Sequence, residues 1–231
     1  MKKGTFYGVG IGPGDPELLT LKAVRILREC PVIAAPQTKS GETLALDIAR
    51  GAVDLSDKTV VPLCFTMDPD REKQAEAHRA AADAAETYLA AGQDVAMLNL
   101  GDVSIYATYG YLMEILRERG YETVMIPGVP SFCAVAARLG VSLTEDMNKP
   151  LHIAPGRVAP EETLPLPGSK VLMKSGSQLP RVLALLRERG ELEHSMLVKN
   201  CGLPGEEVYP NLAQSAPEGG AGYFATLIVK E

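Results

Sequence analysis

The chain of 231 residues carries a formal net charge of −6, and 46% of its residues are hydrophobic while 23% are charged. This length suits one large domain or two modest α/β domains, each able to bury its own core. The acidic balance, with no basic run longer than Lys2-Lys3, argues against a nucleic-acid partner, and the lack of an apolar run of roughly 18 residues argues against a membrane span.

The first half of the chain repeats one unit: a short apolar run, a glycine-bearing turn and an amphipathic helix. Asp15 before Pro16 predicts a helix N-cap with proline in the first helical position. The pattern predicts strands at 5–11, 30–36, 58–65, 93–102 and 121–128, and helices at 16–30, 42–50, 70–92, 106–120 and 131–140.

The last third of the chain has fewer helices, and its strands follow one another through Pro/Gly loops. Alternating strands and helices predict an α/β protein with mostly parallel pairing, and the later change predicts a second domain with a mixed sheet. We therefore expect an N-terminal domain over 1–122 and a C-terminal domain over 123–231. The second domain is predicted to have strands at 151–156, 169–176, 194–202 and 222–230, a helix at 179–190, and a proline-rich loop at 161–168.

The glycine-rich stretch "YGVGIGPGDPELL" follows the first predicted strand and invites a dinucleotide-binding interpretation. The fingerprint G-x-G-x-x-G fails in all three registers, because the sixth position is Pro13, Asp15 or Glu17, and no P-loop motif occurs. Further turns at Gly101-Asp102, Pro127-Gly128 and Ser175-Gly176 also follow predicted strands. Ligands bind at that edge of open parallel sheets, so we expect a cleft that holds a flat or polar cofactor mainly through backbone groups.

Three segments, "VGIGPGDPELLTLKA", "LNLGDVSIYATYGYL" and "IPGVPSFCAVAARLGVSL", closely resemble the successive motifs of the tetrapyrrole (corrin/porphyrin) methyltransferases, which use S-adenosylmethionine. "KVLMKSG" and "GYFATLIVK" resemble the later strands of that family, so the resemblance covers nearly the whole chain. Within the family, the sequence is most similar to enzymes that methylate C20 of cobalt-factor II (cobalt-precorrin-2) or precorrin-2 in cobalamin synthesis.

This resemblance implies a class III methyltransferase-like fold of two α/β domains, with the cofactor in the cleft between them, and a homodimer. It implies S-adenosyl-L-methionine as cofactor, S-adenosyl-L-homocysteine as product, and a substrate-side loop at Gly12, Gly14 and Asp15. Asp102 is the expected catalytic residue, and Asp102→Ala is expected to lower turnover with little change in thermal midpoint. The implied cofactor-binding residues are Pro13, Leu100, Gly101, Asp102, Ile105, Tyr106, Pro130, Ser131, Met173, Lys174, Cys201, Gly202 and Thr226.

Two positions depart from the family pattern. Val103 stands where the second motif usually has proline, which affects the rigidity of the turn. Pro130 stands where the third motif usually has Ser or Thr, so a cofactor contact there must use the Pro130 carbonyl or pass to Ser131.

We expect no metal site. The histidines have no ligand-like neighbours, and the four cysteines are far apart, without a C-x-x-C pair, as suits a reduced cytoplasm. We expect His78 to be a solvated helix residue, and Cys133 and Cys201 to be small buried or backbone-contact residues. Candidates for the substrate carboxylates, none of them singled out, are Lys39, Arg71, Lys149, Arg157 and Lys174.

Three alternatives to a cobalt-dependent C20-methyltransferase remain open from the sequence. In the first, the substrate is metal-free precorrin-2. In the second, methylation occurs at another position of the ring. In the third, the protein binds a small molecule without catalysis.

Overall fold

The computed structural model describes residues 2–37, 41, 43–66, 68–144, 146–218 and 221–230. It divides into two compact units, which we call unit 1 (Met1–Pro130) and unit 2 (Ser131–Glu231). The predicted boundary after residue 122 is therefore too early. The strand β5 (Glu122–Ile126) pairs along its whole length with β1 (Thr5–Gly10), so it belongs to the sheet of unit 1.

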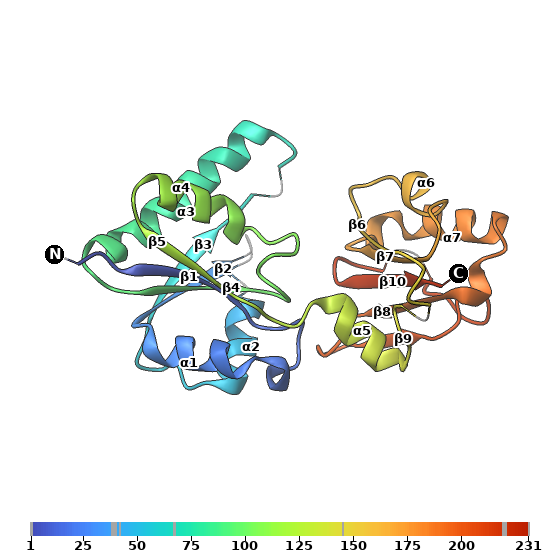
Figure 1. Ribbon diagram of the computed structural model, residues 1–231, viewed down its shortest axis with the longest axis horizontal. Coiled ribbons are helices and arrows are strands. Elements are labelled where there is room, and N and C mark those ends of the chain that lie inside the picture. Colours follow the sequence, from blue (N-terminus) through green and yellow to red (C-terminus); the bar gives the residue numbers. More distant parts are fainter. Residues whose placement is uncertain are drawn as a thin grey trace. The chain divides into compact units, whose positions relative to one another are not determined.

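Unit 1 is a five-stranded parallel sheet with helices on both faces, which confirms the predicted parallel architecture (Figure 1). Its strand order is β3-β2-β4-β1-β5, with α1 and α2 on one face and α3 and α4 on the other. The remaining elements are η1 (Pro16–Leu18), α1 (Leu21–Glu29), β2 (Val32–Gln37), α2 (Leu44–Ala52), β3 (Thr59–Cys64), α3 (Arg71–Ala90), β4 (Val95–Asn99) and α4 (Tyr109–Glu118).

A buried tyrosine fixes α4 against the sheet of unit 1. The Tyr109 ring stacks on Phe6 with centroids 5.1 Å apart, and its hydroxyl donates to the carbonyl oxygens of Phe6 (3.0 Å) and Val124 (3.1 Å). A Cβ added at Gly8 would lie 2.6 Å from the Tyr109 ring, so glycine is needed there for close packing. Burial raises the pKa of Tyr109 to about 12, so the phenol stays protonated as a donor to both strands.

The predicted helix over 16–30 is in fact two helices. Asp15 caps a short 3-10 turn, because its carboxylate accepts from the Glu17 amide at 2.9 Å. The chain is extended at Leu19 and Thr20, and the Thr20 hydroxyl accepts from the Ala23 amide at 3.1 Å to begin α1. The prediction of one helix was wrong because a second N-cap residue interrupts an otherwise helical apolar pattern.

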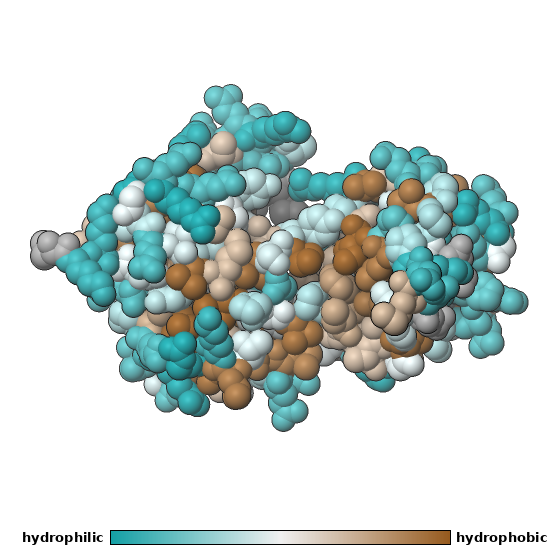
Figure 2. Space-filling model, viewed as in Figure 1, coloured by the Kyte–Doolittle hydropathy of each residue, from teal (hydrophilic) through white to brown (hydrophobic). Residues whose placement is uncertain are grey.

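The helix α3 has the hydrophilic outer surface expected of an exposed helix, visible above the sheet of unit 1 in Figure 2. Its inner face is almost entirely small, with Ala81, Ala82, Ala85 and Leu89 buried against the sheet. Asp70, which the prediction placed inside the helix, is its N-cap and accepts from the Glu72 amide at 2.8 Å. The predicted start of α2 at Glu42 lies outside the described residues.

Unit 2 is a five-stranded mixed sheet with the order β6-β7-β10-β8-β9, which confirms the predicted mixed pairing. β6 and β7 are parallel, and the other neighbours are antiparallel. A short helix, α6, forms in the predicted proline-rich loop, and the sequence reading missed β9. The elements are α5 (Ser131–Leu139), β6 (Leu151–Pro155), α6 (Pro160–Thr163), β7 (Ser169–Met173), η2 (Gly176–Gln178), α7 (Leu179–Glu188), η3 (Leu192–His194), β8 (Ser195–Lys199), β9 (Glu207–Tyr209) and β10 (Ala225–Val229).

Candidate active site

Three loops of unit 1 meet backbone against backbone at the carboxyl ends of β1, β4 and β5. Gly12 and Gly101 exchange hydrogen bonds, from Gly101 N to Gly12 O (2.8 Å) and from Gly12 N to Gly101 O (3.3 Å). A Cβ at Gly128 would lie 2.3 Å from the Gly101 carbonyl oxygen, and one at Gly10 would lie 2.6 Å from the Gly128 amide nitrogen. These glycines let three turns approach one another, which explains a glycine-rich stretch that matches no nucleotide fingerprint.

The Asp102 carboxylate joins two of these loops. Its Oδ1 accepts from the Ser104 amide (2.8 Å) and the Ser104 hydroxyl, and its Oδ2 accepts from the Gly128 amide at 2.8 Å. Burial alone would raise the pKa of Asp102, whose exposure is 9%, but the hydrogen bonds from Ser104 and Gly128 outweigh it and lower the pKa. The carboxylate is thus charged and occupied, and it holds the β4 turn against the β5 turn.

The other predicted residues of unit 1 lie on the same three turns. Leu100 and Ile105 are half-buried, and the exposed Tyr106 has a left-handed φ of 49°. A non-glycine residue in this conformation is held by its surroundings and often marks a functional loop. Pro13 and Gly14 are buried in the first loop, beside the half-buried Asp15.

In unit 2, the predicted residues lie at one edge of the mixed sheet. Met173 and Thr226, both buried, are paired across β7 and β10. Lys174 follows Met173 with a left-handed φ of 57°, donates its amide to the Ala225 carbonyl (3.1 Å), and holds its ammonium 5.3 Å from the Tyr223 ring centroid. This places a cation and an aromatic ring beside Met173 and Thr226.

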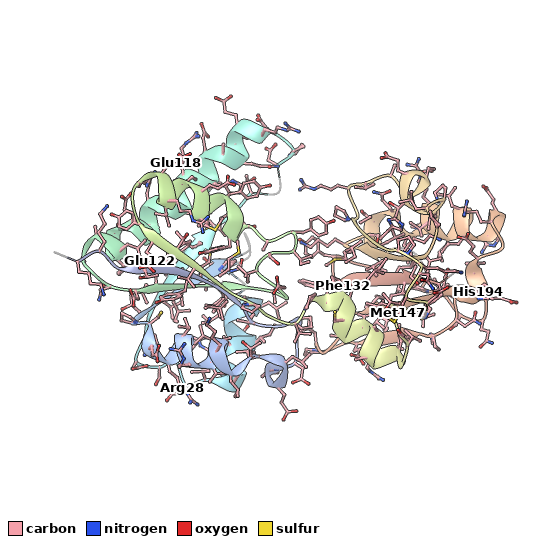
Figure 3. All side chains as sticks on the ribbon, in the orientation of Figure 1. Arg28, Glu118, Glu122, Phe132, Met147 and His194 are labelled. Carbon is pink, nitrogen blue, oxygen red and sulfur yellow. The ribbon has the colours of Figure 1, made fainter. Side chains whose placement is uncertain are left out.

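Cys201 and Gly202 lie in the loop between β8 and β9, with Cys201 half-buried and Gly202 exposed. Burial, with the nearby Glu206 charge, raises the pKa of Cys201 to about 11, so its thiol is neutral. Ser131 opens α5, next to the buried Phe132 (Figure 3), and Pro130 ends unit 1. Cys133 is exposed, so of the two expectations for it, a small buried residue or a backbone-contact residue, the first was wrong.

Among the basic candidates, Arg157 stands out. It is exposed and has no hydrogen bond or ion pair within the described part of the chain. It follows Gly156, where an added Cβ would lie 2.2 Å from the Lys174 carbonyl oxygen, so the two backbones touch. Arg71 is an exposed residue that begins α3, Lys149 has interactions of its own, and Lys39 lies outside the described residues.

The histidines do not lie among the predicted site residues. His78 is half-buried and stacks on Tyr111 with centroids 4.5 Å apart, so the prediction of a freely solvated residue was wrong. His152 bonds the Pro167 carbonyl at 2.9 Å, and His194 is exposed beside β8 (Figure 3). The residues that the structure describes contain no group of three or more His, Cys, Asp or Glu side chains placed to bind a metal, and no helix among them has the length and apolar character needed to cross a bilayer.

Sequence reasoning missed Ser104, Asn200 and Glu206. Ser104 could have been found, since an aspartate with serine two residues on is typical of a side-chain-capped turn. Asn200 and Glu206 hydrogen-bond within the loop between β8 and β9, whose conformation no short motif reveals.

The fold defines a two-unit α/β protein in which glycine turns and backbone polar groups lie at the carboxyl ends of the parallel strands of unit 1. The sequence matches the family of Tetrapyrrole (Corrin/Porphyrin) Methylases over residues 5–217, and the chain belongs to that family. It is 32% identical to the cobalt-precorrin-2 C(20)-methyltransferase of Salmonella typhimurium, over 99% of this chain and 97% of the relative. It is 31% identical to the precorrin-2 C(20)-methyltransferase of a Sinorhizobium species, over 98% and 95%.

Solved structures share this fold over the whole chain. A uroporphyrin-III C-methyltransferase from Thermus thermophilus superposes with a TM-score of 0.72 at 27% identity, covering 99% of this chain and 94% of that one. A structure of the same kind of enzyme from that organism, complexed with S-adenyl homocysteine, superposes with a TM-score of 0.68 at 24% identity, covering 99% and 98%.

Proposed function

We propose that this protein is an S-adenosylmethionine-dependent enzyme that methylates C20 of cobalt-factor II (cobalt-precorrin-2) in cobalamin biosynthesis. The observation that carries the proposal is the similarity, over nearly the full length of both chains, to a relative named for this reaction. The predicted cofactor residues of unit 1 follow the carboxyl ends of its parallel strands, the end where ligands bind in open parallel sheets, and this supports the proposal further.

The residues present fit the proposed cofactor. Adenosylmethionine has an apolar and aromatic body with hydrogen-bonding groups and a positive sulfur, so it suits a site of backbone groups and neutral side chains. In unit 1 the half-buried Leu100 and Ile105 offer apolar contact beside the turn at Gly101, and in unit 2 the buried pair Met173 and Thr226 places a thioether and a hydroxyl side by side on β7 and β10. We propose that both sets contribute to cofactor binding.

When bound, S-adenosylmethionine supplies a methyl group made electrophilic by its positive sulfur. The chain's own residues hold the reactants in line and exclude water, and well-oriented proximity contributes roughly 7–11 kcal/mol to lowering a barrier of this kind. Asp102, predicted as the catalytic residue, acts in this proposal as a positioning residue, because both its carboxylate oxygens already accept hydrogen bonds from the protein.

The substrate carries several carboxylates, and the structure favours Arg157 as one of their partners. Its guanidinium has no acid partner in the described part of the chain, and the backbone of the preceding residue, Gly156, lies against Lys174. Arginine suits this task because its planar fork binds a carboxylate through two hydrogen bonds.

We further propose a homodimer that acts in the cytoplasm. Four free cysteines support a reducing compartment, and the dimer is inferred from the family. Size-exclusion chromatography with light scattering tests the dimer, and a monomer at micromolar concentration would contradict it.

Metal-free precorrin-2 is the second candidate substrate, favoured by the similarity to the Sinorhizobium relative. The deciding experiment is anaerobic incubation with carbon-13 methyl-labelled S-adenosylmethionine and either cobalt-factor II or precorrin-2, followed by NMR. Label at C20 with the cobalt substrate alone supports the proposal, and label with the metal-free ring alone supports the alternative. Tight S-adenosylhomocysteine binding without transfer to either substrate would refute the C20 reaction and favour another ring position or a non-catalytic binding protein.

A further inference from the structure

The loop between β8 and β9 is longer and more constrained than a hairpin requires. Two residues can join antiparallel strands, whereas this loop runs from 200 to 206. Three of its residues have left-handed φ values: Asn200 (50°), Gly202 (73°) and Gly205 (77°). Asparagine tolerates this conformation better than most residues but still needs support from its surroundings.

The support comes from hydrogen bonds inside the loop. The Leu203 amide donates to the Asn200 carbonyl (2.8 Å), the Asn200 side-chain amide donates to the Gly205 carbonyl (3.2 Å), and the Glu206 amide donates to the Leu203 carbonyl (3.2 Å). The loop is also tied to the start of β10, because the Asn200 amide donates to the Phe224 carbonyl at 3.0 Å. A segment that could have been short is therefore held in one shape.

The Glu206 side chain lies at the centre of this arrangement. Its Oε2 accepts from the Gly202 amide at 2.9 Å, and its Oε1 accepts from Arg138 Nε on α5 at 2.6 Å. The carboxylate is 22% exposed, while the Arg138 side chain is 54% exposed. The Gly202 amide and the Arg138 guanidinium lower the pKa of Glu206, so it is charged at neutral pH.

We propose that Glu206 is a positioning residue that fixes the Cys201–Gly202 turn for cofactor binding, and that Arg138 holds Glu206 in place from α5. The inference rests on the proposed function, because Cys201 and Gly202 are predicted cofactor contacts. Gly202 is exposed while its amide is committed to Glu206, so its carbonyl and α-carbon are presented to a ligand in a fixed orientation. A loop that is already ordered before binding loses less conformational entropy when the ligand binds, so the affinity is higher.

Glu207 provides a matched control. It is the next residue, also a glutamate, and also ion-paired, with Lys199 at 2.6 Å, but that pair joins β8 to β9 and does not reach the turn. Loss of an ion pair as such would affect both positions alike, whereas loss of positioning would affect Glu206 alone.

The test compares Glu206→Ala, Glu206→Gln, Arg138→Ala and Glu207→Ala with the wild type. The measurements are S-adenosylhomocysteine affinity by calorimetry, amide hydrogen exchange over 200–206, and KM and kcat in methyl transfer. We expect Glu206→Ala to weaken affinity about tenfold, as for one lost charge-assisted hydrogen bond, and to raise the cofactor KM similarly. At saturating cofactor its kcat should stay near that of the wild type, and exchange at the Gly202 amide should accelerate.

Glu206→Gln keeps one acceptor oxygen and should bind S-adenosylhomocysteine more tightly than Glu206→Ala. The affinity of Arg138→Ala should lie between those of Glu206→Gln and the wild type. The affinity of Glu207→Ala should equal that of the wild type. Equal affinity in Glu206→Ala and wild type, or equal losses at Glu206 and Glu207, would overturn the inference. Wild-type protein that binds S-adenosylhomocysteine but methylates neither tetrapyrrole would refute the proposed reaction while the affinity series still decides the role of Glu206. Wild-type protein that does not bind S-adenosylhomocysteine would overturn both.

Discussion

Replacing Asp102 with alanine removes the acceptor of three hydrogen bonds, from the Ser104 amide, the Ser104 hydroxyl and the Gly128 amide. The sequence alone predicts little change in stability for this variant, and the structure reverses that expectation. A buried donor left without an acceptor costs about 1–3 kcal/mol, and Ser104 and Gly128 are open enough for water to replace part of the loss. We therefore expect the free energy of unfolding to fall by about 2 kcal/mol in total, or about 4–8 °C in thermal midpoint for a chain of this size.

Scanning calorimetry of the cofactor-free protein at several pH values tests this reasoning. The folded-state pKa of Asp102 is lowered, so its stabilising contribution is complete above the ordinary aspartate pKa and is lost as the pH falls through the lowered value. The difference between wild type and Asp102→Ala should stay constant from about pH 5 to pH 8 and shrink below about pH 4. Asp102→Asn, which keeps one acceptor oxygen but places an amide against a donor, should lose a similar amount at neutral pH.

An unchanged thermal midpoint at pH 7 would show that the carboxylate does not hold the two turns together. A difference that persists undiminished well below pH 4 would show that the stability comes from side-chain volume rather than from charge. Either result would refute the positioning role and return Asp102 to the role of a side chain that contacts the cofactor or substrate.

Three further variants, two of them with a control variant, test other parts of the structure. Gly128→Ala should lower the free energy of unfolding by at least about 1–3 kcal/mol, because its Cβ would lie 2.3 Å from a backbone oxygen that cannot move aside. The control Gly110→Ala, in open space within α4, should raise the free energy of unfolding by about 0.5–1 kcal/mol. Equal effects of the two variants in denaturant titrations would contradict the close packing at Gly128. Thr20→Ala should cost about 1 kcal/mol in the same titrations by removing the cap of α1, whereas a cost near zero would mean that packing alone begins the helix. Arg157→Ala should raise the tetrapyrrole KM severalfold without changing S-adenosylhomocysteine affinity, while Arg187→Ala, an exposed residue in the last turn of α7, should change neither; unaltered KM in Arg157→Ala would remove Arg157 from the proposed site.

The order and type of most elements could be predicted because the period of the apolar residues is clear. The sequence of α3 is rich in alanine and free of internal glycine and proline, and the strand β4 is a continuous apolar run, so the structure matches both closely. The reading failed where local capping competes with periodicity, as at Thr20, and where an element is too short to show a period, as in α6 and β9.

The domain boundary was misplaced for a different reason. The sequence shows that β5 is a strand, but no nearby residue indicates which strand it pairs with. Its partner β1 is the first strand of the chain, more than a hundred residues earlier in the sequence. Pairing between such distant segments depends on the whole topology of the sheet, so no window of sequence around residue 122 could have revealed it.

The glycines of the three turns show which structural features a glycine-rich sequence motif can predict. Glycine at 10, 12, 101 and 128 signals a close approach by some other group, and the sequence alone leaves open whether that group is a ligand or the protein itself. In the structure these residues contact one another, and we call this contact between the three turns the crossing. Asp102 stabilises it by accepting hydrogen bonds from Ser104 and Gly128. These contacts make the loops a support, and in our proposal the ligand is contacted by side chains with exposed surface, the half-buried Leu100 and Ile105 and the exposed Tyr106. Mutations at the crossing should therefore reduce stability and binding together, whereas mutations of these side chains should reduce binding alone.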